Sequence, residues 1–585
     1  MTQQEHDRLV MLKQLATERL TNLRPQLEGF AFATRKVDAR IEEYILNVID
    51  NPNRHNVWEQ VAVCRYFRQL KDHRFSPAHV LQFIRFAEKT KTSGNRGRKQ
   101  LCLTPVQCFF AALLYGLRDD QDRRLTTLAY LFIPRKFGKT TFAAVIAVFD
   151  MFCGDHNAEA YVAANSHDQA KICFKEIKNI LRSFDPSERF FKINREEVKF
   201  RNEKIRASSA RCLTANARTK DGLFASLAII DEYAQARNTL TNGGADMKKV
   251  LMSSMGPRKE PMTIVITTAS EVLDGPFVQE LEGVKQVLEA EFLNSEVTNE
   301  HMQALLFCPD VDDAEDDPNT WAKVQPHLGI TVQADYYERE YQTALLSADY
   351  MTEFRTKQLN IFCMNEEKMW IPNEVADKLI AEGQNIFNIQ GLGKCVGALD
   401  LSVHDDMSAV AYVGFSQVTK CYHAHIDYYL PEQAVRNHPM RELYEKWHQE
   451  GHLKYCTGEV IDLQMILNDI ISTSKRIPVV TIGYDPYKAQ DIVNLLQRYA
   501  GKKAATAYKQ TNGAFNIPVE TFEMAAMAQP PHIQFDDNPI THWQLTNCTI
   551  DEDKMNNKKP IKISPNRKID GIICTLMALG IAISK

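Results

Sequence analysis

The chain has 585 residues, too many for one hydrophobic core, and its length predicts two large domains. Hydrophobic residues make up 44% and charged residues 25%, as in ordinary globular proteins, while the net charge of −4 gives no overall basic field that would indicate a nucleic-acid partner. The 13 cysteines form no CxxC pair and no apolar run is long enough to span a bilayer, so we expect neither a structural zinc site, nor a disulfide framework, nor a membrane protein.

The first part of the chain is predicted to form helices. Apolar residues recur three or four positions apart in residues 37–49, 58–70 and 77–90, which is the spacing of amphipathic helices. The polar N-terminus lacks the apolar core of a signal peptide, which indicates a cytosolic protein. A basic stretch containing Gly and Ser, residues 89–99, is expected to be a linker or loop. We therefore assign a helical N-terminal segment to residues 1–95.

An α/β pattern follows. Short β-rich runs alternate with helical stretches between about residues 100 and 270, which predicts a mostly parallel sheet. The four runs are Thr127–Ile133, Glu159–Ala164, Leu227–Ile230 and Met262–Thr267. An acidic stretch, residues 309–318, lacks the central Gly of a calcium-binding loop and is expected to be a solvated surface loop. We assign this domain to residues 96–365.

A phosphate-binding loop is the first candidate site. The sequence Ile133-Pro-Arg-Lys-Phe-Gly-Lys-Thr140 follows an apolar strand and precedes an apolar helix, as a P-loop, or Walker A motif, requires. Lys139 would reach the β- and γ-phosphates, and Thr140 would hold Mg²⁺. Ile133 replaces the first Gly of the usual pattern, and a bare Gly-Lys-Thr is common by chance. The candidate ATP-binding residues here are Arg135, Lys136, Phe137, Gly138, Lys139, Thr140 and Thr141.

A second motif strengthens the first. Residues 227–232 form an apolar strand that ends in two carboxylates, as in a Walker B motif. Asp231 suits Mg²⁺ through water, and Glu232 suits polarising the attacking water. Each motif alone could be an ordinary strand end with surface acids. Both motifs in this order favour a P-loop ATPase of the ASCE type, the class that carries an additional catalytic Glu.

The C-terminal half carries a second α/β pattern that starts near Lys394. Its expected strands are Cys395–Leu401, Ala409–Phe415, Cys421–Tyr429 and Val479–Tyr484, with helices at 431–449 and 488–500. Strands that look antiparallel come first and helix-separated strands follow, which is the order of an RNase H-like fold. We assign a linker to residues 366–390 and a nuclease domain to residues 391–585.

Three carboxylates form the candidate nuclease site. Asp400 ends an apolar strand, Asp485 follows another strand, and Asp570 begins an apolar helix, so the three can meet at one edge of the sheet. Hard divalent cations prefer oxygen ligands, and two such ions can activate water and stabilise the leaving oxygen. We therefore expect Mg²⁺, with Mn²⁺ as a substitute. For each Asp taken alone, a helix cap, a turn or a salt bridge is the more common explanation, and only the co-occurrence of the three with the motifs named below favours a metal site.

These motifs resemble the large subunit of tailed-bacteriophage terminases, in its HK97-type branch, over about residues 100–585. The family's P-loop often lacks the first Gly and carries an Arg, as Arg135 does here, and its Asp-Glu strand is followed by a Thr-Thr-Ala motif. The resemblance implies that Gln107 contacts adenine and that Thr267, Thr268 and Ala269 couple hydrolysis to movement. It implies an arginine finger, for which the candidates are Arg218, Lys220 and Arg135. Asp400-Leu-Ser, Tyr484-Asp-Pro-Tyr487, Lys568-Ile-Asp-Gly571 and Asn547 resemble the nuclease motifs of the family.

The resemblance also implies a function. ATP hydrolysis would drive double-stranded DNA into a procapsid, and the nuclease would cut concatemeric DNA in the cytoplasm of the host cell. The expected partners are DNA, a small terminase subunit, the portal protein and further copies of the chain in a ring. Two alternatives stay open at this point: a helicase–nuclease of DNA repair or defence, which strand unwinding would support, and a non-catalytic ATP-dependent DNA-binding scaffold, which absence of ATP turnover would support.

Overall fold

The structure is a computed structural model that describes residues 3–26, 37–94, 97–164, 167–214, 222–236, 244–273, 275–293, 297–363, 369–380, 383–402, 407–436, 440–486, 489–553, 555–562 and 567–584. The chain divides into two compact units, Met1–Asn365 and Glu366–Lys585, and each is described by itself. No helix among the described residues is both long enough and apolar enough to cross a membrane.

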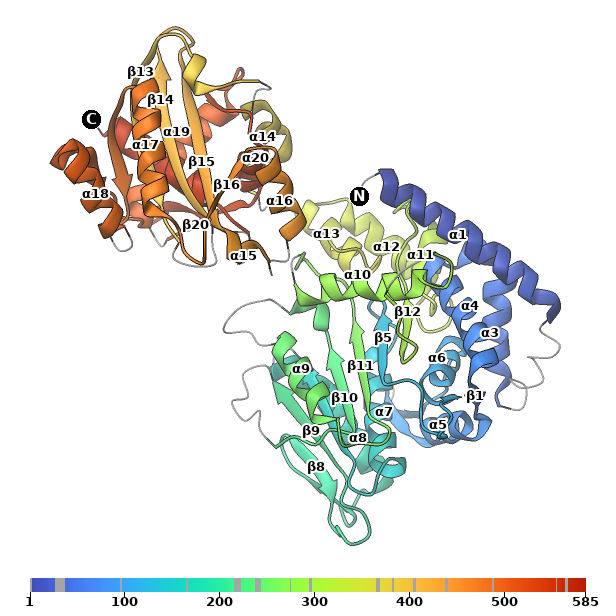
Figure 1. Ribbon diagram of the computed structural model, residues 1–585. Coiled ribbons are helices and arrows are strands. Elements are labelled where there is room, and N and C mark those ends of the chain that lie inside the picture. Colours follow the sequence, from blue (N-terminus) through green and yellow to red (C-terminus); the bar gives the residue numbers. More distant parts are fainter. Residues whose placement is uncertain are drawn as a thin grey trace. The chain divides into compact units, whose positions relative to one another are not determined.

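The N-terminal unit is built on an eight-stranded sheet in the order β12-β5-β11-β10-β6-β9-β8-β7 (Figure 1). Its strands are β5 (Leu128–Phe132), β6 (Glu159–Ala164), β7 (Phe191–Ile193), β8 (Glu197–Phe200), β9 (Ser209–Thr214), β10 (Leu227–Asp231), β11 (Met262–Thr267) and β12 (Met302–Leu306). Only the pairs β7–β8 and β8–β9 are antiparallel. The predicted parallel sheet is therefore confirmed, and its parallel strands bring the carboxyl ends of β5, β11 and β10 to one edge.

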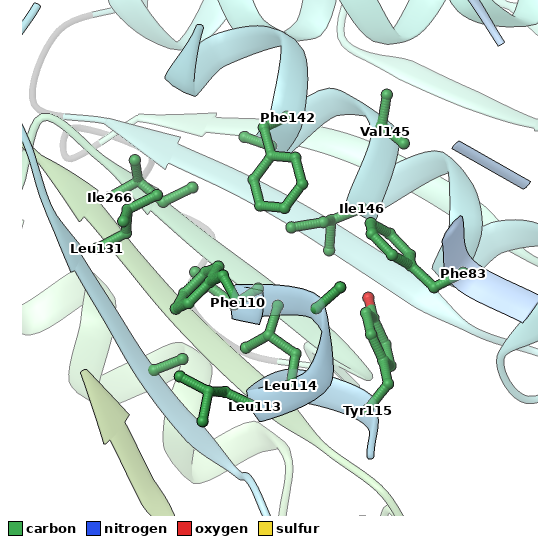
Figure 2. Packing of buried hydrophobic residues seen from close by; sticks show 14 of the residues in the cluster. Phe83, Phe110, Leu113, Leu114, Tyr115, Leu131, Phe142, Val145, Ile146 and Ile266 are labelled. Atoms are coloured by element: carbon green, nitrogen blue, oxygen red, sulfur yellow. The ribbon is translucent and has the colours of Figure 1, made fainter. Parts of the chain in front are cut away.

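Helices cover both faces of this sheet, which explains why its central strands are apolar without alternation. The helices are α1 (Gln3–Leu23), α3 (Ala39–Asp50), α4 (Val57–Asp72), α5 (Pro77–Lys89), α6 (Pro105–Tyr115), α7 (Lys139–Cys153), α8 (His167–Phe184), α9 (Gly244–Ser254) and α10 (Pro276–Glu289). On one face, Phe110 of α6 and Phe142 and Ile146 of α7 lie over Leu131 and Ile266 of the sheet (Figure 2). On the other face, α1, α4, α9 and α10 enclose a second apolar cluster.

A small helical subdomain closes this unit. It comprises α11 (Pro318–Val324), α12 (Ala334–Ala344) and α13 (Ala348–Lys357), and it has its own core around Trp321, Tyr337 and Phe354. We call residues 318–361 the helical subdomain.

One expectation about loops in this unit is wrong, and another holds only in part. The basic stretch near residue 95 contains a hairpin of β2 (Lys91–Gly94) and β3 (Gly97–Gln100) rather than only a linker. The acidic stretch is not merely solvated, because the Asp310 carboxylate accepts a hydrogen bond from the backbone N–H of Val57 at 2.8 Å and pairs with Lys13 and Lys323. Asp310 therefore satisfies the first backbone N–H of α4 and ties together α1, α4 and the helical subdomain. A two-stranded pair of β1 (Arg74–Phe75) and β4 (Leu117–Arg118) completes the unit.

The C-terminal unit has a second sheet in the order β16-β15-β14-β13-β17-β18, with β19 paired to β15. Its strands are β13 (Leu392–Asp400), β14 (Ser408–Ser416), β15 (Cys421–Pro431), β16 (Leu453–Cys456), β17 (Val479–Tyr484), β18 (Ala505–Ala507) and β19 (Ile533–Phe535), and β20 (Cys548–Glu552) pairs with β21 (Lys558–Lys562) in a separate hairpin. The strands β13, β14 and β15 are antiparallel and the other neighbours are parallel. The predicted fold class is confirmed.

The helices of this unit again lie on both faces. They are α14 (Asn373–Leu379), α15 (Glu432–Arg436), α16 (Arg441–Gln449), α17 (Leu463–Arg476), α18 (Gln490–Ala500), α19 (Asn512–Met527), α20 (Pro539–Thr546) and α21 (Asp570–Ile583). The helix α21 is apolar along almost its whole length and packs on β13 and β14, while α17 and α18 cover the opposite face. This packing fixes the N-terminal end of α21, and with it Asp570, beside the end of β13.

Candidate functional sites

The first candidate site lies where β5 leads into α7. Gly138 has φ of +87° and precedes the first residue of α7, a left-handed conformation that glycine adopts without strain. Lys136 also has a positive φ, of 76°. The loop therefore turns sharply between the strand and the helix, and the N-terminus of α7 is available to an anion. The side chain of Arg135 is exposed, whereas that of Phe137 is buried.

Lys139, the first residue of α7, is buried and turned back toward its own loop. Its ammonium group donates hydrogen bonds to the carbonyl oxygens of Ile133 at 3.2 Å and Pro134 at 3.3 Å, and to the hydroxyl of Thr268. Burial lowers the pKa of Lys139, whereas the charges of Glu232 and Asp231 raise it. The ammonium is held by neutral oxygens, which are weaker acceptors than phosphate.

The two carboxylates of the second motif stand at the end of β10. Asp231 is buried, and burial together with the neighbouring charge of Glu232 raises its pKa. Glu232 has φ of 52° and ψ of 40°, a left-handed backbone conformation that is uncommon for a residue with a side chain. Its backbone N–H is held by the carbonyl of Ile266 at 2.9 Å.

The Thr-Thr-Ala segment lies between the two motifs, because β11 separates β5 from β10. The Thr267 hydroxyl accepts from the backbone N–H of Ala234, just after the Asp-Glu pair, at 2.9 Å. The Thr268 hydroxyl donates to the carbonyl of Ile133, in the phosphate loop, at 2.8 Å. The hydroxyl of Thr267 therefore bonds to the residues after the Asp-Glu pair, and that of Thr268 bonds to the phosphate loop. This segment is thus hydrogen-bonded to both motifs.

The helical subdomain holds the phosphate loop from outside, which the sequence did not indicate. Gln325 donates to the carbonyl of Arg135 at 2.8 Å, and the ring of His327 stacks on Phe137 with centroids 4.3 Å apart. The backbone N–H of Arg135 donates to the carbonyl of Lys357 at 3.0 Å, and its guanidinium pairs with Glu353 at 3.0 Å. No motif marks these residues, because their role depends on tertiary packing.

The other predicted nucleotide residues are placed as follows. Gln107 is buried in the first turn of α6, where its side-chain oxygen accepts from the backbone N–H of Thr104 at 3.0 Å in a capping box. Thr140 and Thr141 occupy the first turn of α7 and are partly exposed. Among the arginine-finger candidates, Arg218 and Lys220 lie outside the described residues.

The second candidate site lies in the C-terminal unit. Asp400 at the end of β13, Asp485 after β17 and Asp570 at the start of α21 line one pocket of about 320 Å³. The pairing of β13 with β17 and the packing of α21 on β13 bring the three together. The same pocket is also lined by Lys559 and Lys562 of β21 and by Gln510.

Neighbouring residues of the predicted nuclease motifs support the end of α21. The amide of Asn547 donates to the carbonyl of Lys568 at 3.2 Å and accepts from the Arg567 guanidinium at 3.3 Å. The backbone N–H of Gly571 donates to the side-chain oxygen of Gln544 at 2.7 Å. These contacts position the segment that carries Asp570.

The donor set of this pocket fits a hard divalent cation, because it consists of carboxylate oxygens beside basic side chains. Over the described residues, however, no group of three or more His, Cys, Asp and Glu side chains has the arrangement needed to hold a metal ion. The three carboxylates border a shared cavity without meeting at one point.

Comparisons with known proteins give the same division of labour as the two sites. The family model described as terminase large subunit, ATPase domain, matches residues 105–286, and that described as terminase large subunit, endonuclease domain, matches residues 298–585. Protein YmfN of Escherichia coli (strain K12) is 26% identical over 381 residues, which are 63% of this chain and 80% of that protein.

A phage protein and a solved structure extend the likeness. The terminase large subunit of Enterobacteria phage HK97 is 20% identical over 485 residues, which are 82% of this chain and 90% of that protein. The crystal structure of the HK97 bacteriophage large terminase aligns with a TM-score of 0.50 at 20% identity, covering 86% of this chain and 99% of that one, which supports the fold.

A P-loop ATPase followed by a nuclease domain with carboxylates at a sheet edge defines a class of protein that moves nucleic acid at the cost of ATP and also cuts it. The chain belongs to the terminase large subunit family. It is a viral DNA-packaging motor with ATPase and metal-dependent endonuclease activity, and the helicase–nuclease and scaffold alternatives are not favoured.

Proposed function

We propose that the residues at the end of β5, β10 and β11 perform the ATPase reaction. Lys139 turns from its loop carbonyls to the β- and γ-phosphates of ATP, while Thr140 and Asp231 hold Mg²⁺. Glu232 orients and polarises the attacking water. The segment of Thr267, Thr268 and Ala269 couples ATP hydrolysis to movement. Its hydrogen bonds to both neighbouring motifs support this role.

The remaining nucleotide contacts belong to the same proposal. The loop residues Arg135 to Thr141 surround the phosphates, and Gln107 lies on the adenine side. The finger that stabilises the transition state is Arg218, Lys220 or Arg135. The exposed guanidinium of Arg135 would have to leave Glu353 to play this part.

We further propose that Asp400, Asp485 and Asp570 bind the metal ions of the nuclease, Mg²⁺ or in its place Mn²⁺. The observation that supports this most directly is their common pocket. Bound metal would activate water and stabilise the leaving 3′-oxygen. The carboxylates must close around the ions, and Lys559 and Lys562 lie where they can hold the DNA backbone.

In the assembly, several copies of the chain form a ring on the portal protein of the procapsid, and a small terminase subunit supplies site recognition. The chain acts in the host cytoplasm. Residues 96–365 form the motor, 391–585 the nuclease and 366–390 the linker, while the helices α1, α3, α4 and α5 of the segment 1–95 pack against the motor sheet and support it.

The experiment that tests the nuclease assignment is plasmid cleavage by the full chain in Mg²⁺ or Mn²⁺. Wild type should nick and linearise supercoiled plasmid, and Asp400→Ala should not. Asp462→Ala is a matched control, since Asp462 is an acid of the same unit that only caps α17. Equal cleavage by wild type and Asp400→Ala would refute the site.

A further inference from the structure

A second lysine stands at the phosphate loop. Lys357 is the last residue of α13, in the helical subdomain, and its ammonium donates to the carbonyl oxygen of Ala269 at 2.8 Å. Ala269 directly follows Thr268, whose hydroxyl is held by the ammonium of Lys139. The ammonium groups of Lys139 and Lys357, more than 200 positions apart in the sequence, are thus hydrogen-bonded to consecutive residues of one short segment.

The backbone around Lys357 fixes where its side chain begins. Its carbonyl oxygen accepts from the N–H of Arg135, inside the phosphate loop, at 3.0 Å. Just beyond it, Asn360 accepts from the N–H of Ala269 at 2.7 Å and donates to the carbonyl of Phe307 at 2.7 Å. The lysine stem therefore starts at a point locked to the loop and to the Thr-Thr-Ala segment, and the four-carbon stem alone can redirect the charge.

The charges around Lys357 agree with a position at the reacting end of the nucleotide. Burial and the charge of Arg135 lower the pKa of Lys357, whereas Glu232 raises it. The charge of Lys357 also lowers the pKa of Lys139. Lys357 is therefore within electrostatic reach of the residues assigned to the γ-phosphate and to the attacking water.

We propose that Lys357 is a second phosphate-binding cation of the ATPase site, whose ammonium leaves the Ala269 carbonyl for an oxygen of the γ-phosphate when ATP binds. A phosphate oxygen is a charged acceptor and a carbonyl a neutral one, so the exchange is favourable. ADP has no γ-phosphate, and with ADP the ammonium stays on Ala269. The helical subdomain thereby distinguishes the two nucleotides. This inference rests on the proposed ATPase site.

The experiment measures Mg²⁺-dependent binding of ADP and of ATPγS, a slowly hydrolysed ATP analogue, to the full chain. A hydrogen bond to a charged group contributes about 1.5–3 kcal/mol. The uncharged variant Lys357→Met should therefore weaken ATPγS binding about tenfold or more, and ADP binding less than about twofold. Lys357→Arg should restore most of the difference because it keeps the charge.

Arg355→Gln is the control on the same helix, because Arg355 pairs with Glu315 and not with Ala269. It should leave the ratio of the two affinities unchanged. If Lys357→Met weakens both nucleotides equally, or neither, Lys357 is only a structural clamp and the proposal is wrong. If wild type binds no ATPγS at all, the proposed ATPase site fails instead.

A second measurement uses the wild-type chain and does not depend on the folding of a variant. An amine-acylating reagent labels accessible lysines, and mass spectrometry reads the rate at Lys357. ATPγS should slow the labelling of Lys357 more than ADP does, whereas Lys199 of β8, an accessible lysine paired with Glu203, should respond equally to both. Equal protection of Lys357 by the two nucleotides would overturn the proposal.

Discussion

The glycine after Asp570 is expected to be indispensable for the nuclease. An alanine Cβ at Gly571 would stand 2.6 Å from the hydroxyl oxygen of Tyr428 and 2.7 and 2.9 Å from two of its ring carbons. Tyr428 is fully buried and its hydroxyl is hydrogen-bonded to Thr541 at 3.0 Å. The ring has no room to retreat, so the start of α21 must shift and carry Asp570 with it.

The size of the effect follows from three contributions. Overpacking a core by one methyl costs about 1–3 kcal/mol, and a lost Tyr428–Thr541 hydrogen bond costs about 1 kcal/mol. Replacing a helical glycine with alanine offsets about 0.5–1 kcal/mol of this. We expect Gly571→Ala to lower the free energy of unfolding by about 1–3 kcal/mol, which for a domain of this size lowers Tm by about 2–4 °C per kcal/mol.

The assay compares two glycines in the same helical position. Gly513 is the second residue of α19, as Gly571 is of α21, but an added Cβ there meets nothing within 4 Å. Gly513→Ala should raise Tm slightly and cleave plasmid normally, whereas Gly571→Ala should lower Tm and, by displacing Asp570, the proposed metal ligand, by about 1 Å, cleave about 100-fold more slowly. ATP hydrolysis should be unchanged in both. Equal stability and equal cleavage of the two variants would refute the steric reasoning.

Three further predictions address the two sites and the C-terminal core. Glu232→Ala should bind ATP normally but hydrolyse it about 10²–10⁴-fold more slowly; normal turnover would remove Glu232 from the mechanism. Asp485→Ala should lose plasmid cleavage and keep ATP hydrolysis, and loss of both would point to misfolding. Burial lowers the pKa of His425, but hydrogen bonds and charges from Asp427 and Asp536 raise it overall, to about 9 from 6.5. The stabilisation that protonated His425 contributes is therefore complete below about pH 6.5 and is lost as pH rises through about 9. The Tm of wild type should fall over this window more than that of His425→Gln. Parallel curves of Tm against pH for the two proteins would contradict this prediction.

The sheets and their site edges could be predicted because they follow from local patterns. The strands at 159–164 and 262–267 agree with the prediction at both ends, since an apolar run flanked by polar turns has only one extended interpretation. The three aspartates share a pocket because each stands at an element end, and the fold order brings those ends together. Their roles as metal ligands stay a prediction.

Residues that act through tertiary contacts could not be found in this way. Lys357 looks like an ordinary basic residue at a helix C-terminus, a common position for lysine, and nothing nearby in sequence indicates the phosphate loop. The sequence did not single out Asp310, because it lies in a run of acidic residues and such a run is usually solvated. Its burial depends on Lys13 and Lys323, which come from distant segments.

The helices α1, α3, α4 and α5 cover the motor sheet. The segment that matches the ATPase family model is therefore shorter than the segment that must be present for the motor to fold. The terminase ATPase family model matches this chain from residue 105, the first residue of α6. A chain cut there would lose Val63, Phe67 and Phe83 from one face of the sheet and Trp58 from the other, all of them buried. The N-terminal helices are thus an inseparable part of the motor's folding unit, and a change in them should alter the stability of the ATPase without touching the phosphate loop or the Asp-Glu pair.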